Sequence, residues 1–221
     1  MRKILILLAL ISSSAFAADL KPYIEGQLGW SNLNDVDTKA TNLPISDAVT
    51  ASATAKIKYD NSVSGGFEIG ANHVGIENLR IGVSFNRMKF DMEKVTGSLA
   101  LSTSSASLET TGDITEAVRS LGVDLDNSVK LYMANAYYDI KNASAFTPFI
   151  GLGVGMADIK NAKDNEFAWS ASVGGKYNID KNMYLGLKGS YTSVNGITDK
   201  IGLEYKDMDA YSAHALLGYQ F

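Results

Sequence analysis

The chain has 221 residues, with no cysteine and a formal net charge of −4 at pH 7. The lack of cysteine excludes disulfides, thiol catalysis and cysteine-based zinc fingers, and the mild acidity argues against nucleic acid as a partner. Hydrophobic residues make up 46% of the chain, yet no apolar run approaches the ~20 residues of a membrane-spanning helix. If this chain crosses a membrane, it must do so as a closed β-barrel.

The N-terminal residues have the features of a secretory signal peptide. Two basic residues follow the initiator methionine, an apolar run extends over Ile4 to Ile11, and Ala15-Phe16-Ala17 provides a small-residue cleavage site. The apolar run is too short for a membrane anchor. We predict a signal peptide over residues 1–17 and one domain over residues 18–221, whose net charge is −6 after the two basic residues are removed.

The first expected strand runs from about Pro22 to Ser31. One alternate set is apolar and the other is mostly polar, and they comprise Ile24, Gly26, Leu28 and Trp30 against Tyr23, Glu25, Gln27 and Gly29. Alternate residues of a strand point to opposite faces, and an apolar outer face with a polar inner face is typical of membrane barrels. The polar residues 32–61 then predict a first surface loop, in which Ile57 and Tyr59 could extend the next strand above the membrane.

The second and third strands are expected over Ser62–Asn72 and upward from Leu79, joined by a short turn. On the third strand the outward set ends with Phe85, and continuing the alternation would place Arg87 in lipid. This would cost ~2–4 kcal/mol at the membrane centre but ~0–1 kcal/mol near an interface. Two interpretations remain: the membrane zone ends near Phe85, or a bulge turns Met88, Phe90 and Met92 outward.

The stretch 93–128 is the longest and most acidic connection, and we expect a surface loop here. Asp113 followed three residues later by Glu116 is a plausible helix start. Ile114, Val118 and Leu121 then lie at helical spacing, and Gly122 can end the helix. Such a helix would pack on the barrel rim, or act as a lid or a partner-binding element.

The fourth and fifth strands are expected over Lys130–Ile140 and Phe146–Asp158, joined by a tight turn. The fifth reads F-T-P-F-I-G-L-G-V-G-M-A-D, and its alternation persists through the glycines. A nucleotide-binding glycine motif would instead need a turn and a helix. The glycines are therefore expected to leave room inside a narrow barrel for bulky neighbours such as Tyr137 and Tyr184.

The remaining strands are expected over Glu166–Asn178, Met183–Val194 and Tyr211–Phe221, which brings the count to eight. The predicted fold is all-β: an eight-stranded antiparallel up-and-down transmembrane barrel with short periplasmic turns and longer extracellular loops. Outward aromatic residues then form two levels, as two membrane interfaces favour. The upper level holds Trp30, Tyr132, Phe167, Trp169, Tyr191 and Tyr211, and the lower level holds Tyr138, Tyr177, Tyr219 and Phe221.

Eight strands enclose a space that side chains can fill, or that holds one small ligand. The inward ionisable residues balance to zero charge, and they are Glu25, Glu68 and Asp139 against Arg80, Lys176 and Lys188. Buried charges must be paired, so we interpret these six residues as a structural network that plugs the lumen rather than as an ion pathway.

Catalysis has little support in the sequence. His73 lies at a turn, and His214 faces inward with Ser212 and Ser190 or Ser170 as candidate neighbours, but no spacing marks a nucleophile, a base and an orienting acid. Two isolated histidines do not form a metal site. We expect no catalytic residues, no metal and no cofactor.

Three segments resemble the opacity-like and bacterial surface-antigen family of outer-membrane barrels: M-A-N-A-Y-Y-D-I (133–140), F-T-P-F-I-G-L-G-V-G-M-A (146–157) and the terminal G-Y-Q-F (218–221). The resemblance implies an eight-stranded barrel with variable surface loops that often meet host molecules. It also implies that Tyr219 and Phe221 belong to a terminal signal read by the barrel-assembly machinery.

These observations lead to a non-enzymatic surface protein of the cell outer membrane, either adhesin-like or structural, as the first hypothesis. Its expected partners are outer-membrane lipid, the assembly machinery and, through the loops, host or extracellular surface molecules. The alternatives are a narrow channel or small-ligand carrier and, less favoured, a lipid-modifying enzyme. A soluble lipocalin would instead turn its apolar residues inward.

Overall fold

The computed structural model describes residues 20–37, 41–46, 49–74, 76–103, 107–116, 127–160, 162–196 and 207–221, and for 41–46, 49–53, 98–103, 107–110 and 127 only the backbone is considered. Its strands are β1 (Lys21–Leu33), β2 (Val36–Asp37), β3 (Thr41–Ser46), β4 (Val49–Tyr59), β5 (Ser62–Asn72), β6 (Leu79–Phe90), β7 (Met92–Thr103), β8 (Ser107–Asp113), β9 (Asn127–Asp139), β10 (Phe146–Ile159), β11 (Glu166–Asn178), β12 (Met183–Val194) and β13 (Met208–Gln220). The expected signal peptide lies outside the described residues and stays a prediction. No helix in the described ranges is long and apolar enough to cross a membrane.

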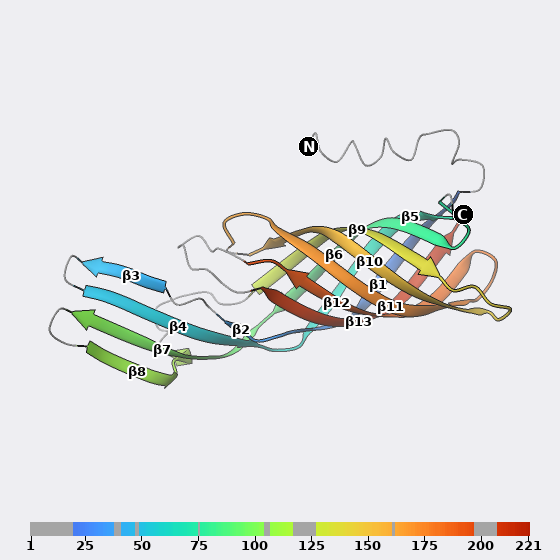
Figure 1. Cartoon of the computed structure of the whole chain (residues 1–221). Coiled ribbons are helices and arrows are strands. Elements are labelled where there is room, and N and C mark those ends of the chain that lie inside the picture. Colours follow the sequence, from blue (N-terminus) through green and yellow to red (C-terminus); the bar gives the residue numbers. More distant parts are fainter. Residues whose placement is uncertain are drawn as a thin grey trace.

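Eight strands close into an antiparallel barrel in the order β1-β13-β12-β11-β10-β9-β6-β5 (Figure 1). The last strand pairs with the first, with Ile24 opposite Tyr219 and Trp30 opposite Ala213. This closure leaves neither terminal strand with a free edge. The predicted eight-stranded antiparallel barrel is confirmed, and β5, β11 and β12 begin and end at the predicted residues.

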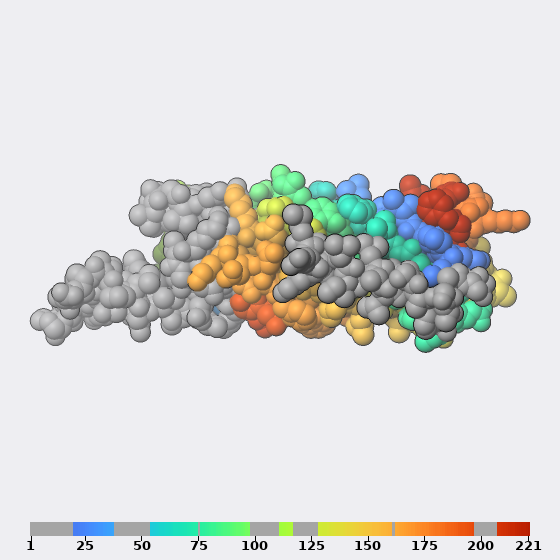
Figure 2. All heavy atoms as spheres, turned by 90° about the horizontal axis from the view of Figure 1, so that it is seen from above, coloured from blue at the N-terminus to red at the C-terminus, as the bar shows by residue number. Residues whose placement is uncertain are grey.

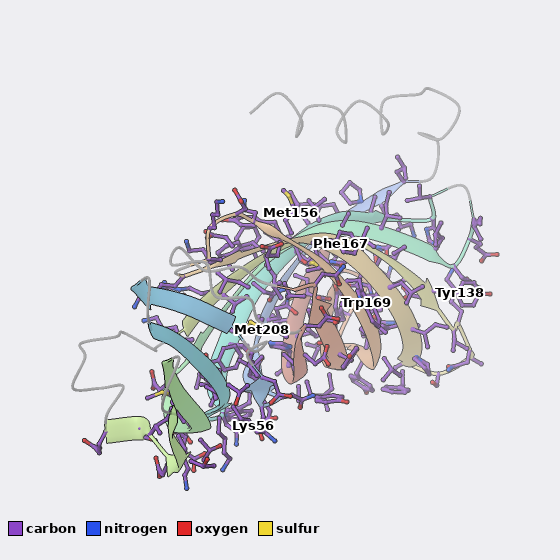
Figure 3. All side chains as sticks on the ribbon, turned by 60° about the vertical axis from the view of Figure 1, so that its left-hand side comes forward. Lys56, Tyr138, Met156, Phe167, Trp169 and Met208 are labelled. Atoms are coloured by element: carbon purple, nitrogen blue, oxygen red, sulfur yellow. The ribbon has the colours of Figure 1, made fainter. Side chains whose placement is uncertain are left out.

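The outer wall of the barrel is apolar because one alternate set of every barrel strand points outward. Leu28 is 65% exposed and Leu187 is 71% exposed, which suits a wall that faces lipid and not water. The aromatic residues of the two predicted levels lie on this wall. The rings of Trp169, Tyr191 and Tyr211 contact one another in sequence across three adjacent strands. In Figure 3 Phe167 and Trp169 lie nearer the end from which the second sheet projects than Tyr138 does.

A second sheet projects beyond the barrel, at the end opposite the C-terminus (Figure 1). Its strands run in the order β2-β4-β7-β8, and β3 also pairs with β4. The predicted surface loops over 32–61 and 93–128 are therefore wrong in much of their length. The strand β4 reads V-T-A-S-A-T-A-K-I-K-Y and alternates regularly, but its alanines give a weak apolar signal until β7 lies beside it.

The second sheet continues the barrel wall. Only residues 60 and 61 separate β4 from β5, and only Asp91 separates β6 from β7. A register shift between Lys58 and Tyr59 marks the junction. A local irregularity of this kind bends a strand and increases its twist, so the two strands can leave the closed barrel as an open hairpin.

The register of β6 decides between the two interpretations of Arg87. Its pairing with β5 and β9 is continuous, so the bulge alternative is wrong. Met88 and Phe90 point inward and are buried, and Met92 is buried at the start of β7. Arg87 points outward and is exposed, which fits a membrane zone that ends near Phe85.

The predicted helix start is present in the described residues. Thr115 and Glu116 are helical, and Asp113 Oδ1 accepts hydrogen bonds from the Thr115 backbone N–H (3.0 Å) and hydroxyl (2.6 Å). An aspartate that accepts from the first turn in this way is a typical N-cap. The rest of the predicted helix, including Val118, Leu121 and Gly122, lies outside the described residues.

Candidate functional site: the barrel interior

The lower part of the lumen holds a buried charge network centred on Arg80. An Arg80 Nη lies 3.8 Å from carboxylate oxygens of both Glu25 and Glu68, and its Nε lies 3.5 Å from Asp139. Lys176 pairs with Asp139 at 2.6 Å. Five of the six predicted interior charges therefore meet in one cluster, which is the compensation that buried charges need.

Three buried tyrosines donate hydrogen bonds to the carboxylates of the two buried glutamates. Tyr23 and Tyr137 (2.7 Å) both donate to Glu68, and Tyr184 donates to Glu25 at 2.8 Å. Hydrogen bonds to an ionised acceptor are stronger than those between neutral groups. The sequence placed these tyrosines inside the barrel but did not reveal that they are the partners of the glutamates.

The Arg80 guanidinium is held more by charge and ring faces than by hydrogen bonds. Its Nε and one Nη have no hydrogen-bond partner among the described residues. Instead its Cζ lies 4.0 Å from the ring centre of Tyr137 and 5.1 Å from that of Phe149. A desolvated cation over an aromatic face gains ~2 kcal/mol, so Phe149 belongs to this site although it is apolar.

Glycines make room for the tyrosines. A Cβ on Gly151 would lie 2.3 Å from the Tyr137 ring, and a Cβ on Gly218 would lie 2.0 Å from the Tyr184 ring. The prediction for Tyr137 against the glycines of the fifth strand is confirmed. For Tyr184 it is wrong, because that ring lies over Gly218 on β13.

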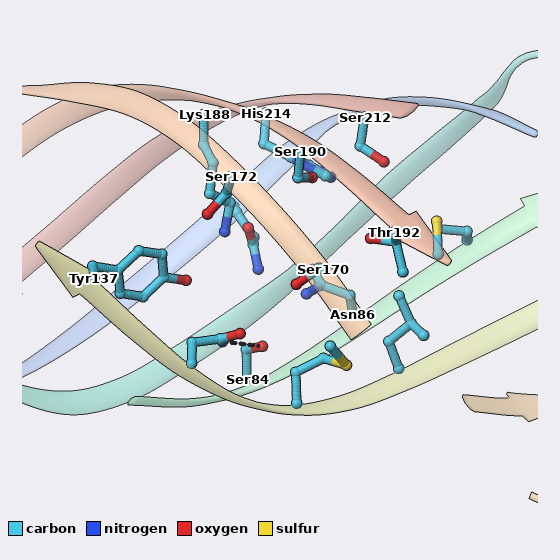
Figure 4. A pocket seen from close by; sticks show the side chains of 15 residues that line it. Ser84, Asn86, Tyr137, Ser170, Ser172, Lys188, Ser190, Thr192, Ser212 and His214 are labelled. Atoms are coloured by element: carbon cyan, nitrogen blue, oxygen red, sulfur yellow. Dashed lines mark hydrogen bonds between the residues drawn. The ribbon is translucent and has the colours of Figure 1, made fainter. Parts of the chain in front are cut away.

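Lys188 lies apart from the charge network. It is buried on β12, opposite His214 on β13, and no ion pair joins it to a carboxylate within the described residues. Figure 4 shows Lys188 and His214 beside the same internal space. The sequence predicted six inward charges with a net charge of zero, but it could not show that Lys188 lies in a separate layer from the other five.

The internal space above the network is a polar cavity of about 40 Å³, lined by Lys188, His214, Gln27 and several serines. Both polar atoms of the Gln27 amide and Nδ1 of His214 are buried without a partner among the described residues. A water needs ~10–15 Å³ of such volume and two to four polar partners. The cavity is therefore large enough for a few waters that satisfy these groups, and too small for most metabolites.

His214 does have a serine partner, but not one of those predicted. Its Nε2 lies 2.9 Å from Ser64 Oγ, and Ser64 accepts a hydrogen bond from Ser31 (2.7 Å). Ser212, Ser190 and Ser170 line the same cavity instead. Among the described residues, no carboxylate orients Nδ1, which a catalytic triad would require. Nor do three His, Cys, Asp or Glu residues gather as a metal site anywhere in the described ranges.

The upper part of the lumen and the base of the second sheet are closed by an apolar cluster. Its buried members are Leu33, Val36, Ile57, Tyr59, Met88, Phe90, Met92, Val95, Val129, Leu131, Met133, Ala157, Ile159, Ala168, Val194, Met208 and Ala210. The inward residues thus change from charged to polar to apolar along the barrel axis. An apolar layer of this kind is unfavourable for water and ions.

The comparisons with known proteins agree with this architecture. Residues 4–221 match the outer membrane protein beta-barrel domain family. The chain belongs to this family. Outer membrane protein PagN of Salmonella typhimurium is 32% identical over 110 residues, which span 42% of this chain and 45% of PagN.

Two solved structures share the fold of this outer-membrane barrel. The crystal structure of Neisserial surface protein A superposes with a TM-score of 0.55 at 14% identity, covering 90% of this chain and 97% of that one. The NMR structure of outer membrane protein AlkL in lipid bilayers gives 0.50 at 16% identity, covering 91% and 90%. Identities this low show the fold alone.

Membership in the family shows what surrounds each surface of the barrel. The protein is located in the cell outer membrane, so its apolar wall faces lipid. The short connections from β5 to β6, from β9 to β10 and from β11 to β12 mark the periplasmic end, and the second sheet projects from the other end.

Proposed function

We propose that this protein is a non-enzymatic surface protein whose rigid barrel displays the second sheet outside the cell. The observation that carries the proposal is the pairing of β4 with β7 over residues 49–59 and 92–103, which extends the barrel wall well beyond the membrane. Side chains fill the lumen below this sheet, which supports a role of the barrel as a rigid scaffold and not as a channel for solutes. Similarity to proteins named as outer-membrane and surface proteins agrees with this view.

Adhesion to host or extracellular molecules is the specific function that we propose for the second sheet. The test replaces residues 99–110 by Asn-Gly, a pair that favours the tight turn of a hairpin. Because Ser98 is paired with Thr111, this variant keeps the base of the β7–β8 hairpin and removes its tip. A non-adherent bacterium that carries either protein is then counted on epithelial monolayers, and barrel folding is verified by the heat-dependent gel shift.

We expect the intact chain to increase attachment and the trimmed chain to lose that gain while it still folds. Attachment no greater than with an empty vector would remove the adhesin function and leave the structural one. Equal attachment by the intact and trimmed chains would move the adhesive surface away from the hairpin tip.

The six interior charges serve, in this proposal, as a structural plug. The polar cavity of about 40 Å³ is the observation that favours the alternative, a narrow channel or small-ligand carrier. It lies between the charge network and the apolar cluster, and its small size supports the plug. Reconstitution in a planar bilayer separates the two functions, because steps of conductance in the intact protein would contradict the plug.

A lipid-modifying enzyme is the least supported function. His214 is buried and its only described side-chain partner is Ser64. Replacing His214 by Ala is expected to leave the lipid profile of the outer membrane unchanged. A changed profile would reopen this possibility.

We also propose that Tyr219 and Phe221 act as the terminal signal for barrel assembly. Their exposed rings meet edge to face at a centroid distance of 5.0 Å at the end of the closing strand, and the Phe221 N–H donates to the Pro22 carbonyl at 2.9 Å. A chain without Tyr219-Gln220-Phe221 should fail to reach the outer-membrane fraction and lose its heat-dependent gel shift. Normal insertion of the truncated chain would contradict the signal.

A further inference from the structure

Cations gather on one part of the outer wall, just above the upper aromatic level. The described outward residues between the two aromatic levels are uncharged. The outward charges on the upper rim of the barrel strands begin with Arg87, Lys89 and Asp91 at the end of β6, Lys130 on β9, Asp158 on β10 and Asp209 on β13. Three of these are cations, and all three belong to the adjacent strands β6 and β9.

The register brings the three cations together. Arg87 lies opposite Lys130 in the β6–β9 ladder, and Lys89 follows Arg87 on the same face of β6. Side chains at opposite positions of an antiparallel pair have Cβ atoms roughly 5 Å apart, and like charges at such positions destabilise the sheet. The pair of Arg87 and Lys130 therefore favours a counter-charge between them.

The protein supplies only part of that counter-charge. Asp158 pairs with Lys130 at 2.9 Å. The Lys89 backbone N–H donates to Ser62 Oγ at 3.0 Å, but neither the Arg87 guanidinium nor the Lys89 ammonium has an ion pair or hydrogen bond within the described residues. Gly65, on the other side of Arg87, has no side chain. Arg87, Lys89, Lys130 and Asp158 together carry two positive charges. Beyond Lys89 lie the exposed residues Asp91 and Asp60, whose backbones are joined by a hydrogen bond of 3.0 Å.

The position of these three cations just above the lipid-facing wall indicates which kind of anion supplies the remaining counter-charge. Directly below Arg87 and Lys130 lie Phe85 and Tyr132, whose ring centroids are 5.3 Å apart and which belong to the lipid-facing wall. A ligand that contacts both layers has an anionic headgroup joined to acyl chains. Guanidinium and ammonium groups recognise phosphate through charge-assisted hydrogen bonds, and basic clusters at membrane surfaces bind phosphorylated headgroups.

We propose that Arg87, Lys89 and Lys130 form a binding site for a phosphate group of an outer-leaflet glycolipid, with its acyl chains against Phe85 and Tyr132. This inference rests on the outer-membrane location of the barrel and not on adhesion. The site would fix the height of the barrel in the membrane on the β6–β9 side.

The test uses the folded full-length mature protein in zwitterionic detergent, titrated with diphosphorylated lipid A. The same titration is made with dephosphorylated lipid A and with inorganic phosphate, which separate the glycolipid from its phosphate alone. The variant is Arg87→Gln with Lys89→Gln, and a single Lys89→Gln variant gives a milder change. The matched control, Lys21→Gln with Lys181→Gln, removes two exposed cations from the periplasmic end.

Diphosphorylated lipid A is expected to bind the double variant roughly thirtyfold more weakly than the intact protein, since each of the two cations near a membrane surface contributes ~1 kcal/mol. The single variant should fall between them, and the control should match the intact protein. Equal binding by the intact protein and both variants would overturn the site. Equal binding of dephosphorylated lipid A would overturn the phosphate contact, and full competition by inorganic phosphate at the same concentration would overturn the glycolipid as its source.

Discussion

The lower part of the lumen is filled by charged and hydroxyl-bearing side chains, and the upper part is filled by apolar ones. Below, Arg80 and its partners form a network of charges and tyrosines. Above, Phe90 and its neighbours form an apolar cluster. An eight-stranded barrel leaves just enough room for side chains, and both solutions close it.

The difference lies in how each part responds to the loss of one member. In the charge network each group is tolerated only because its partners are present, so one deletion leaves the others buried and uncompensated. In the apolar cluster a deletion costs contacts and volume, and neighbours can partly fill the space. The stability of the lower part should therefore depend on the charge and hydrogen-bonding groups of each side chain. The stability of the upper part should depend on side-chain volume.

Replacing Arg80 by Met should have the largest effect. It leaves Glu25 and Glu68 without a cation within ion-pair distance among the described residues. The free energy of unfolding should fall by roughly 3–5 kcal/mol, measured by urea titration in lipid vesicles. Arg80→Lys should lose less because it keeps the charge, and an Arg80→Met variant as stable as the intact protein would contradict the network.

Replacing Phe90 by Ala should come next, with a loss of roughly 3 kcal/mol. Phe90 is 1% exposed and packs with Tyr59 at a ring distance of 6.4 Å, whereas flexible methionines nearby can fill part of the cavity. Phe167→Ala is the matched control on the same rim, because that ring is half exposed to lipid. Equal losses at the two positions would mean that the upper cluster is not a packed core.

The two interior lysines should then differ from each other. Lys176→Met removes the 2.6 Å partner of Asp139 and should cost about 2 kcal/mol, the range for a lost hydrogen bond to a charged group. Lys188→Met removes a cation with no ion pair in the described chain and should change stability by less than about 1 kcal/mol. The same urea titration measures both, and a larger loss for Lys188 would place it within the network after all.

The sequence predicted the barrel because alternation, turn length and the closing strand all pointed to one fold. It predicted the inward charges for the same reason, since alternation fixes the face of each residue. It could not show which charges meet, because the isolation of Lys188 and the bond between His214 and Ser64 depend on strands far apart in the chain. The second sheet was missed because alternating Ala with Thr or Ser is a weak signal without its partner strand.

Replacing Asp113 by Ala should have the smallest effect, confined to the second sheet and the turn that follows it. Hydrogen bonds from Thr115, first from its hydroxyl and then from its backbone N–H, lower the pKa of the Asp113 carboxyl below its usual value. A group with a lowered pKa in the folded state stabilises above its unfolded pKa and loses this effect as the pH falls through its folded pKa. Limited proteolysis after residue 113 should therefore become faster in Asp113→Ala at neutral pH. The difference in rate from the intact protein should shrink in acid. The heat-dependent gel shift of the barrel should stay unchanged.

Asp180→Ala is the matched control, because that carboxylate has a similarly lowered pKa from backbone hydrogen bonds but lies in a periplasmic turn. If Asp113→Ala also weakened the barrel, the second sheet and the closed wall would have to unfold as one cooperative unit, and the contrast between them would fail.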